Sequence, residues 1–129
     1  MKDIIEVINS MEEIVCGKAV KESEIEQAEK ELGLKFSDEY HRYVKNFGCM
    51  AIGGREFTGI SNLVNYSVIT ITVAQKHYNT SIPADWYVIE QLNIDGIVIW
   101  QATTGEVYQT SPNAEPIKLC NSMAEYINL

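Results

Sequence analysis

The amino-acid sequence predicts an α+β domain, in which N-terminal helices are followed by a mostly antiparallel sheet and a C-terminal helix. Up to Gly48, apolar residues recur at helical spacing between helix start and stop signals. From Trp86 onwards, short β-type runs alternate with tight-turn signals, and a capping sequence precedes one last helix. Helices followed by hairpin-connected strands are typical of the α+β class.

The first expected element is a helix of about three turns over residues 3–15. Its apolar residues share one helical face: Ile4, Ile5, Ile8, Met11 and Val15. Acidic residues interrupt this pattern and no small-residue cleavage site follows it, so the segment differs from a signal peptide. The sequence therefore predicts a cytoplasmic protein.

Two short helices are expected between residues 20 and 48. Ser23 is the expected cap of the first, Glu26 completes a capping box, and Gly33 ends the helix. Its apolar face comprises Ile25, Ala28 and Leu32. Ser37 is the next candidate cap, and Gly48 closes the second helix. The apolar face of this helix comprises Tyr40, Tyr43, Val44 and Phe47.

The middle of the chain is less regular. Residues 49–59 contain several glycines and predict a turn-rich connection with a short strand around residues 55–57. Residues 67–79 fit two structures. Ile69, Ile71 and Val73 alternate with threonines, which favours a strand, whereas Val68, Ile71 and residues 74–77 fit a helix that continues to Tyr78.

The C-terminal part predicts a hairpin-connected sheet. Its β-type runs are residues 86–89, 97–102 and 107–110, with a further extended stretch at 116–119. Asp95-Gly96 and Thr104-Gly105 are tight-turn signals. Ser122 then forms a second capping box with Glu125 and opens a terminal helix through Ile127.

Length and charge restrict the kind of partner. The 129 residues contain no repeat or linker, so we expect a single domain over residues 1–129. The net charge of −8, from 10 basic and 18 acidic residues, disfavours direct binding of nucleic acid and permits a basic protein partner. No apolar run approaches the roughly 20 residues that span a membrane.

The sequence predicts no catalytic residue, no metal site and no cofactor, and therefore a protein that is not an enzyme. It has no nucleophile elbow, phosphate loop, dinucleotide fingerprint or zinc-protease helix. Cys16, Cys49 and Cys120, with His41 and His77, lack metal-ligand spacing, and we expect free thiols. A histidine and a cysteine lining one deep pocket would revive an enzymatic alternative.

The candidate partner-binding residues lie in the C-terminal half. No lysine or arginine occurs between His77 and Ile117, so acids there are unopposed. Strand alternation predicts that the neighbours Trp86 and Tyr87 do not both lie in the core. Trp and Tyr are common in protein interfaces. The candidates are Asp85, Trp86, Glu90, Asp95, Trp100, Glu106 and Tyr108. The alternative is that both tryptophans fill the core and the acids only keep the sheet soluble.

The order of these signals resembles the SUKH superfamily, the Smi/Knr-type proteins, over roughly residues 20–129. The resemblance rests on the segments 23–31, Leu32-Gly33-Leu34, 37–40, Gly48, Ile82-Pro83, 88–90, Asp95-Gly96, 104–107 and 122–127. Two positions depart from the family pattern: Ser37 stands where proline is frequent, and Ile94-Asp95-Gly96 replaces a common Gly-Asp pair. The resemblance favours a helix over residues 67–79.

The resemblance implies an α+β fold, no enzymatic activity and direct binding of a toxin domain. Because bacterial members of the superfamily mostly neutralise toxins, we expect an immunity protein for the C-terminal domain of a cognate toxin. The expected toxin is of the LXG type, and its domain is expected to be a basic nuclease. A different class is a regulatory scaffold, as in the fungal relatives linked to cell-wall signalling. Stoichiometry and self-association stay open.

Overall fold

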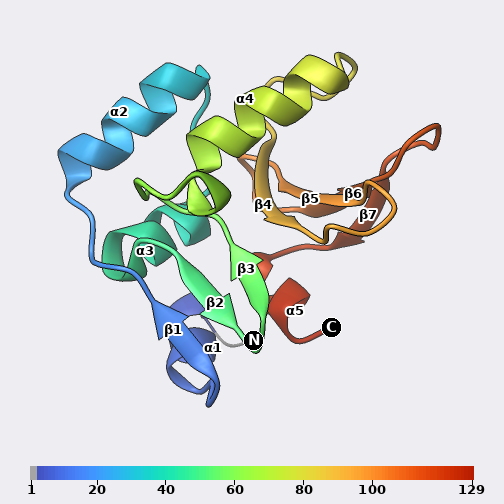
Figure 1. Cartoon of the computed structure of the whole chain (residues 1–129). Helices are drawn as coiled ribbons and strands as arrows, with labels where there is room; N and C mark the ends of the chain where they lie inside the picture. The colour runs from blue at the N-terminus through green and yellow to red at the C-terminus, as the bar shows by residue number, and fades with distance from the viewer. Residues whose placement is uncertain (1–2) are drawn as a thin grey trace.

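The computed structural model describes residues 3–129 and confirms the α+β class. The helices are α1 (Ile4–Asn9), α2 (Glu22–Leu32), α3 (Asp38–Phe47), α4 (Val68–Tyr78) and α5 (Met123–Ile127), with a 3-10 turn η1 (Val64–Tyr66). The strands are β1 (Ile14–Cys16), β2 (Met50–Ile52), β3 (Arg55–Phe57), β4 (Tyr87–Gln91), β5 (Val98–Gln101), β6 (Val107–Thr110) and β7 (Ile117–Cys120). Figure 1 shows the chain from its N-terminal helix to α5.

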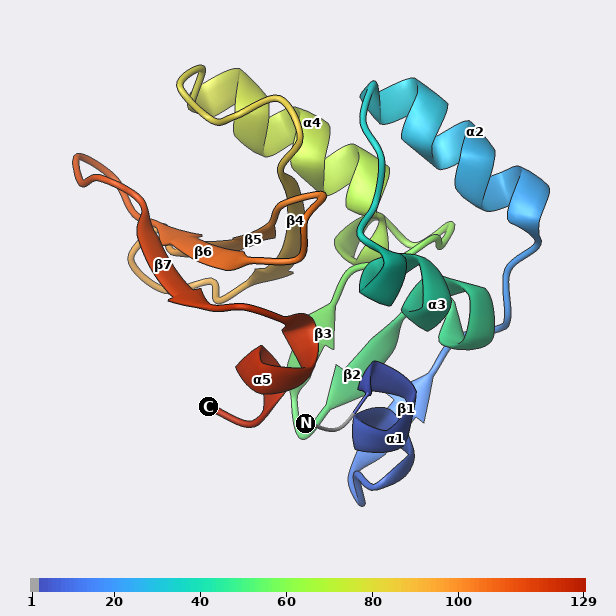
Figure 2. The same ribbon diagram turned by 180° about the vertical axis from the view of Figure 1, so that it is seen from behind.

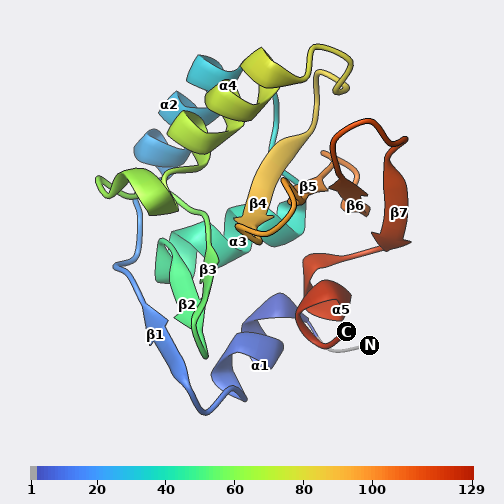
Figure 3. The same cartoon turned by 45° about the vertical axis from the view of Figure 1, so that its right-hand side comes forward.

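The strands form one antiparallel sheet in sequence order, from β1 at one edge to β7 at the other. The connection that contains η1 and α4 separates β3 from β4, which meet at the pair Phe57–Glu90. Figures 1 and 3 show β1–β3 and β4–β7 as two arms of this sheet that turn away from each other. The β5–β6 turn therefore lies far from the β1 edge.

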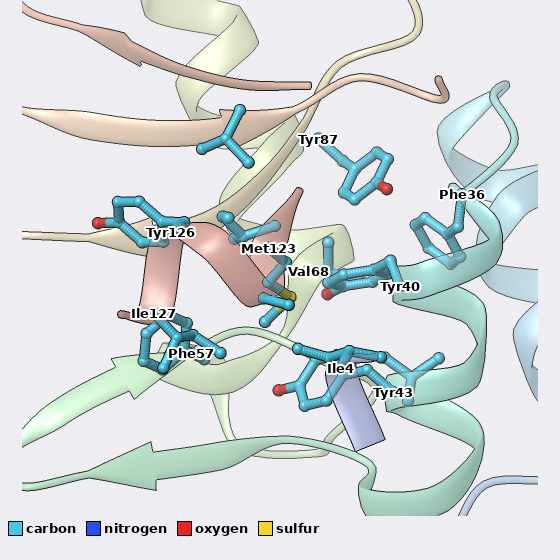
Figure 4. Close-up of a cluster of buried hydrophobic side chains, with 14 of the residues drawn as sticks. Ile4, Phe36, Tyr40, Tyr43, Phe57, Val68, Tyr87, Met123, Tyr126 and Ile127 are labelled. Carbon is cyan, nitrogen blue, oxygen red and sulfur yellow. The ribbon is translucent and has the colours of Figure 1, made fainter. Parts of the chain in front are cut away.

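The main core lies between the sheet and the helices α1, α3 and α5, which Figure 2 shows from behind. Figure 4 shows its centre, where side chains from all three helices meet residues of the sheet. Ile4, Tyr40, Tyr43, Phe57 and Met123 are fully buried there. Each such burial stabilises the fold by roughly 1.5–3 kcal/mol.

A second core lies on the opposite face of the sheet, beneath α4. Its buried members are Ile71, Trp86, Val88, Val98, Trp100 and Ala102. Tyr87 points into the main core with 0% of its surface exposed, and Trp86 into the second core with 7%. The prediction that these neighbours do not both lie in the core is wrong, because both faces of this part of the sheet are covered.

The N-terminal helix is shorter than predicted. It ends at Asn9, and the Ser10 hydroxyl donates to the Val7 carbonyl oxygen at 2.7 Å in its last turn. Residues 14–16 form β1 instead, with Val15 opposite Ala51 of β2. Strand pairing with a distant segment overrides the helical periodicity of this short stretch, since propensity is a weak preference.

The starts of the helices confirm two of the three predicted serine caps. Ser37 caps α3 by accepting from the Tyr40 N–H at 3.0 Å, and Ser122 caps α5 by accepting from the Glu125 N–H at 3.1 Å, as predicted. The predicted Ser23 cap is wrong, because α2 already begins at Glu22 and Ser23 lies within its first turn. Gly33 ends α2 with the expected left-handed conformation (φ 68°).

Residues 68–78 form a helix, α4, which is the structure that the family resemblance favoured over propensity. The Ser67 hydroxyl caps α4 by accepting from the Thr70 N–H at 3.2 Å. The Thr72 hydroxyl accepts from the Val88 N–H at 3.0 Å, which fixes the helix against β4. Tertiary contacts thus determine the structure of a segment whose local sequence fits both a helix and a strand. Among residues 3–129, no helix is long and apolar enough to cross a membrane.

Candidate partner-binding surface

An acidic groove with a volume of about 730 Å³ opens between α2, the start of α3, the β5–β6 turn and the start of α5. Five of its lining residues carry carboxylates: Glu22, Glu26, Glu29, Asp38 and Glu39. Its basic or potentially basic residues are Lys35 and His41. Carboxylates therefore dominate the groove, which we call the acidic groove below.

The floor of the acidic groove is held in place by Glu39 of α3. One carboxylate oxygen accepts from the Met123 N–H at 2.6 Å and from the Gln101 amide at 2.8 Å, and the other accepts from the Ala124 N–H at 2.9 Å. A carboxylate at the first backbone N–H groups of a helix satisfies donors that have no partner within the helix. Glu39 thus joins α3 to α5 and β5.

A buried hydrogen-bond network lies directly behind Glu39. The Tyr87 hydroxyl accepts from the Ser37 N–H at 2.9 Å and donates to the Gln101 side-chain oxygen at 2.9 Å. Burial raises the pKa of Tyr87, so this phenol stays protonated and can donate at neutral pH. The network fixes the start of α3 against β4 and β5, which makes this wall of the acidic groove rigid.

Three of the five groove carboxylates already have partners within the protein: Glu39, described above, Glu22 and Glu29. Glu22 interacts with His41 at 2.6 Å and with Lys45 at 3.3 Å, and these contacts lower the pKa of Glu22, the hydrogen bond from His41 being the largest cause. The buried Glu29 accepts from the Phe36 N–H at 2.8 Å and lies 3.7 Å from the Lys35 ammonium.

Two groove carboxylates remain for a partner. Within residues 3–129, Glu26 and Asp38 form no ion pair, and both side chains are exposed. Both residues line the acidic groove, where a basic group from another molecule could meet their exposed charges.

Asp85 and Glu106, two of the sequence-predicted residues, lie beside this groove. The Thr103 N–H donates to the Asp85 carboxylate at 3.3 Å, and the Thr103 hydroxyl donates to the Lys35 carbonyl oxygen at 2.5 Å. The next residue, Thr104, donates its hydroxyl to the Glu106 carboxylate. Thr103 and Thr104 both line the groove, so the β5–β6 turn joins Asp85 and Glu106 to its rim.

The predicted aromatic residues lie on the other face of the sheet, in and around the second core. Trp86 stacks on Tyr108 with ring centroids 4.2 Å apart. Trp100 is 1% exposed, and its indole N–H donates to the Thr110 hydroxyl at 2.8 Å. The tryptophans are therefore core residues, which was the alternative interpretation, whereas Tyr108 is half-buried and reaches the surface.

Glu90 and Asp95 lie away from the acidic groove. Glu90 is 2% exposed, and Arg55 and Tyr126 satisfy its carboxylate inside the protein, so it cannot contact a partner without rearrangement. Asp95 is exposed in the β4–β5 turn, where its φ of 52° fits the predicted tight turn. In antiparallel strands this turn lies at the opposite end from the β5–β6 turn.

Sequence reasoning missed the acids of α2 and α3. Glu26 and Asp38 lie among alternating charges that are typical of a solvated helix face. They face a groove only because the β5–β6 turn and the start of α5 pack beside them, and no local signal reports that packing. Among the described residues, no group of His, Cys, Asp or Glu side chains is arranged to hold a metal ion.

Helices cover both faces of one antiparallel sheet, and a capped C-terminal helix completes this α+β domain. The chain matches the family model described as "SUKH_5: SMI1-KNR4 cell-wall" over residues 1–128 and belongs to this family.

A solved structure supports the same fold. A crystal structure of a protein from Pseudomonas syringae pv. tomato superimposes with a TM-score of 0.69 at 13% identity, over 97% of this chain and 92% of that chain. This likeness concerns the fold alone. No curated protein matches the sequence.

Proposed function

We propose that this protein is an immunity protein that binds the C-terminal domain of a cognate toxin and neutralises it by occlusion. Membership of the SUKH family, which includes immunity proteins, supports this function. The proposed target is the nuclease domain of an LXG-type toxin, and the proposed site of action is the cytoplasm. No chemistry of the chain's own is required, because covering the toxin is sufficient.

The acidic groove is the observation that supports the proposal best. A nuclease needs a positive cleft to hold phosphates, and a surface with fixed carboxylates is complementary to such a cleft. Glu26 and Asp38 supply unpaired charge at the groove, and Asp85 and Glu106 extend it along the rim. Tyr108 is half-buried on the other face of the sheet and is a separate candidate contact outside the groove.

Co-expression with the toxin domain encoded beside this chain tests the function. We expect the cells to survive when both are made, and the two proteins to co-purify as a stable complex. A toxin domain with an inactivated active site supplies the matched binding control, because it separates binding from rescue. Cell death together with no complex would contradict the proposal for that toxin.

A regulatory scaffold is the second candidate, and the cell-wall wording of the family description favours it. The gene neighbourhood separates the two functions. A neighbouring gene whose product ends in a nuclease domain supports immunity, whereas a neighbourhood of signalling or wall-synthesis genes supports the scaffold.

A further inference from the structure

The β1 edge of the sheet is open. β1 is the first strand in the sheet order and pairs with β2 on one side. Figures 1 and 3 show no helix or strand beyond β1 on its other side. Val15 at the centre of β1 is 73% exposed.

The hydrogen-bond register shows which backbone groups of β1 face outwards. Val15 lies opposite Ala51, the Gly17 N–H donates to the Cys49 carbonyl oxygen, and the Glu13 carbonyl oxygen accepts from the Gly53 N–H. Residues 13, 15 and 17 therefore direct their backbone groups to β2. Since these directions alternate along a strand, Ile14 and Cys16 present their N–H and C=O groups to the open edge.

The opposite edge of the sheet is protected, and the contrast is informative. β7 follows Pro116, carries Lys118 within the strand, and has an irregular register where it pairs with Val107 and Tyr108. Proline, lysine and bulges are the usual devices that prevent an edge strand from pairing with another chain. β1 itself has none of them.

We propose that β1 pairs antiparallel with β1 of a second copy of this chain, around a two-fold axis at Val15. In this register Ile14 lies opposite Cys16 of the second copy, and their outward backbone groups form the hydrogen bonds. Val15 lies opposite Val15 of the second copy in a close non-hydrogen-bonded pair. Two seven-stranded sheets become continuous.

Charge complementarity identifies the occupant as a second copy. Glu12 precedes β1 and Lys18 follows it, and both side chains are exposed. The antiparallel register centred on Val15 brings the bend that holds Glu12 towards Lys18 of the second copy, and the symmetry repeats this pair. Neither residue forms an ion pair within residues 3–129.

The proposed dimer leaves both acidic grooves accessible. β1 is the first strand of the sheet, whereas the turn that lines the groove joins the fifth and sixth strands, β5 and β6. A dimer would therefore present two copies of the proposed toxin-binding surface.

Sedimentation equilibrium with charge-exchange variants tests the proposal. We expect the wild type to associate reversibly to a dimer, and Glu12→Lys or Lys18→Glu to raise the dimer Kd about tenfold, because each replaces two attractive pairs by two repulsive ones. The double variant with both changes should restore the dimer. Monomeric wild type up to about 1 mM, or a dimer that neither single change weakens, would overturn the proposal.

Cross-linking tests the register itself. In a Cys16→Ser background, Val15→Cys should form an intermolecular disulfide when oxidised glutathione is added, because facing residues of a non-hydrogen-bonded pair lie close enough to bridge. Glu24→Cys, on the exposed face of α2, is the matched control and should not cross-link. Equal cross-linking of both variants would overturn the register. A monomer whose Val15→Lys variant loses toxin binding would assign the edge to a foreign strand instead.

Discussion

The carboxylate of Glu90 connects three elements of the fold. Its two oxygens accept from the Arg55 guanidinium at 2.9 and 3.0 Å, and one of them also accepts from the Tyr126 hydroxyl at 2.6 Å. The guanidinium in turn lies 4.9 Å from the ring centre of Phe57. These contacts hold β3, β4 and α5 together at the point where the two arms of the sheet meet.

Replacing this carboxylate tests its structural role. We expect Glu90→Gln to lower the free energy of unfolding by about 2 kcal/mol, because Arg55 loses its charged partner and the amide cannot accept at both positions. Urea unfolding followed by circular dichroism measures the change. Glu115→Gln, at an exposed position, is the control and should be neutral. An unchanged urea midpoint for Glu90→Gln would show that the triad does not stabilise the fold.

The lowered pKa of Glu22 predicts that part of the protein's stability is lost at acidic pH. Its folded-state pKa is lowered, first by the hydrogen bond from His41 and then by Lys45. The stability from this contact is therefore present above the usual carboxyl pKa and is lost as the pH falls through the lowered folded-state value.

A comparison of thermal unfolding at several pH values checks this expectation. Glu22→Gln should be less stable than the wild type near neutral pH, and the two melting temperatures should converge as the pH falls below about 4. A difference between the two proteins that does not change with pH would contradict the assignment.

At the scale of elements, α5 depends on a residue of α3. Glu39 accepts hydrogen bonds from the first N–H groups of α5 and from Gln101. We expect Glu39→Gln to destabilise the protein by roughly 1–3 kcal/mol, since the amide offers one acceptor oxygen and turns its own donors towards N–H groups.

Hydrogen exchange separates this local effect from a general loss of stability. In Glu39→Gln, the amides of Met123 and Ala124 should exchange faster relative to those of α4, with which Glu39 forms no hydrogen bond. Glu125→Gln, within α5 itself, serves as the control. Uniform acceleration in all elements would contradict the capping role of Glu39.

Elements with complete local signals could be predicted from the sequence. Ser37 and Ser122 combine a capping hydroxyl with a following apolar face, and the β5 and β6 runs combine β-branched and aromatic residues between turn residues. β1 has three residues and exists through its pairing with β2, so its own sequence could not reveal it. The capping-box motif at Ser23 places the helix start wrongly, because α2 already begins at Glu22.

At the scale of the whole molecule, the candidate site is a product of packing. α2, the start of α3, the β5–β6 turn and the start of α5 are distant in sequence and meet around one groove. The absence of basic residues between His77 and Ile117 indicates acids such as Asp85 and Glu106, which lie beside this groove and stay a prediction. It could not show that Glu90 turns inwards to Arg55, nor that Glu26 faces the same groove from another helix.

The rate of association with the toxin domain is the property that depends most on the charges of the acidic groove. We expect the double variant Glu26→Lys/Asp38→Lys to bind about tenfold or more slowly at low salt, because it reverses the two unpaired charges of the groove. Glu24→Lys/Glu31→Lys makes the same change in net charge on α2 outside the groove and is the matched control.

Stopped-flow measurements over a range of salt concentrations give these rates for the wild type and both variants. We expect the groove variant to slow association far more than the control does, and this difference to shrink as salt screens the charges. Equal rates for the two double variants would show that binding responds to net charge and not to the acidic groove.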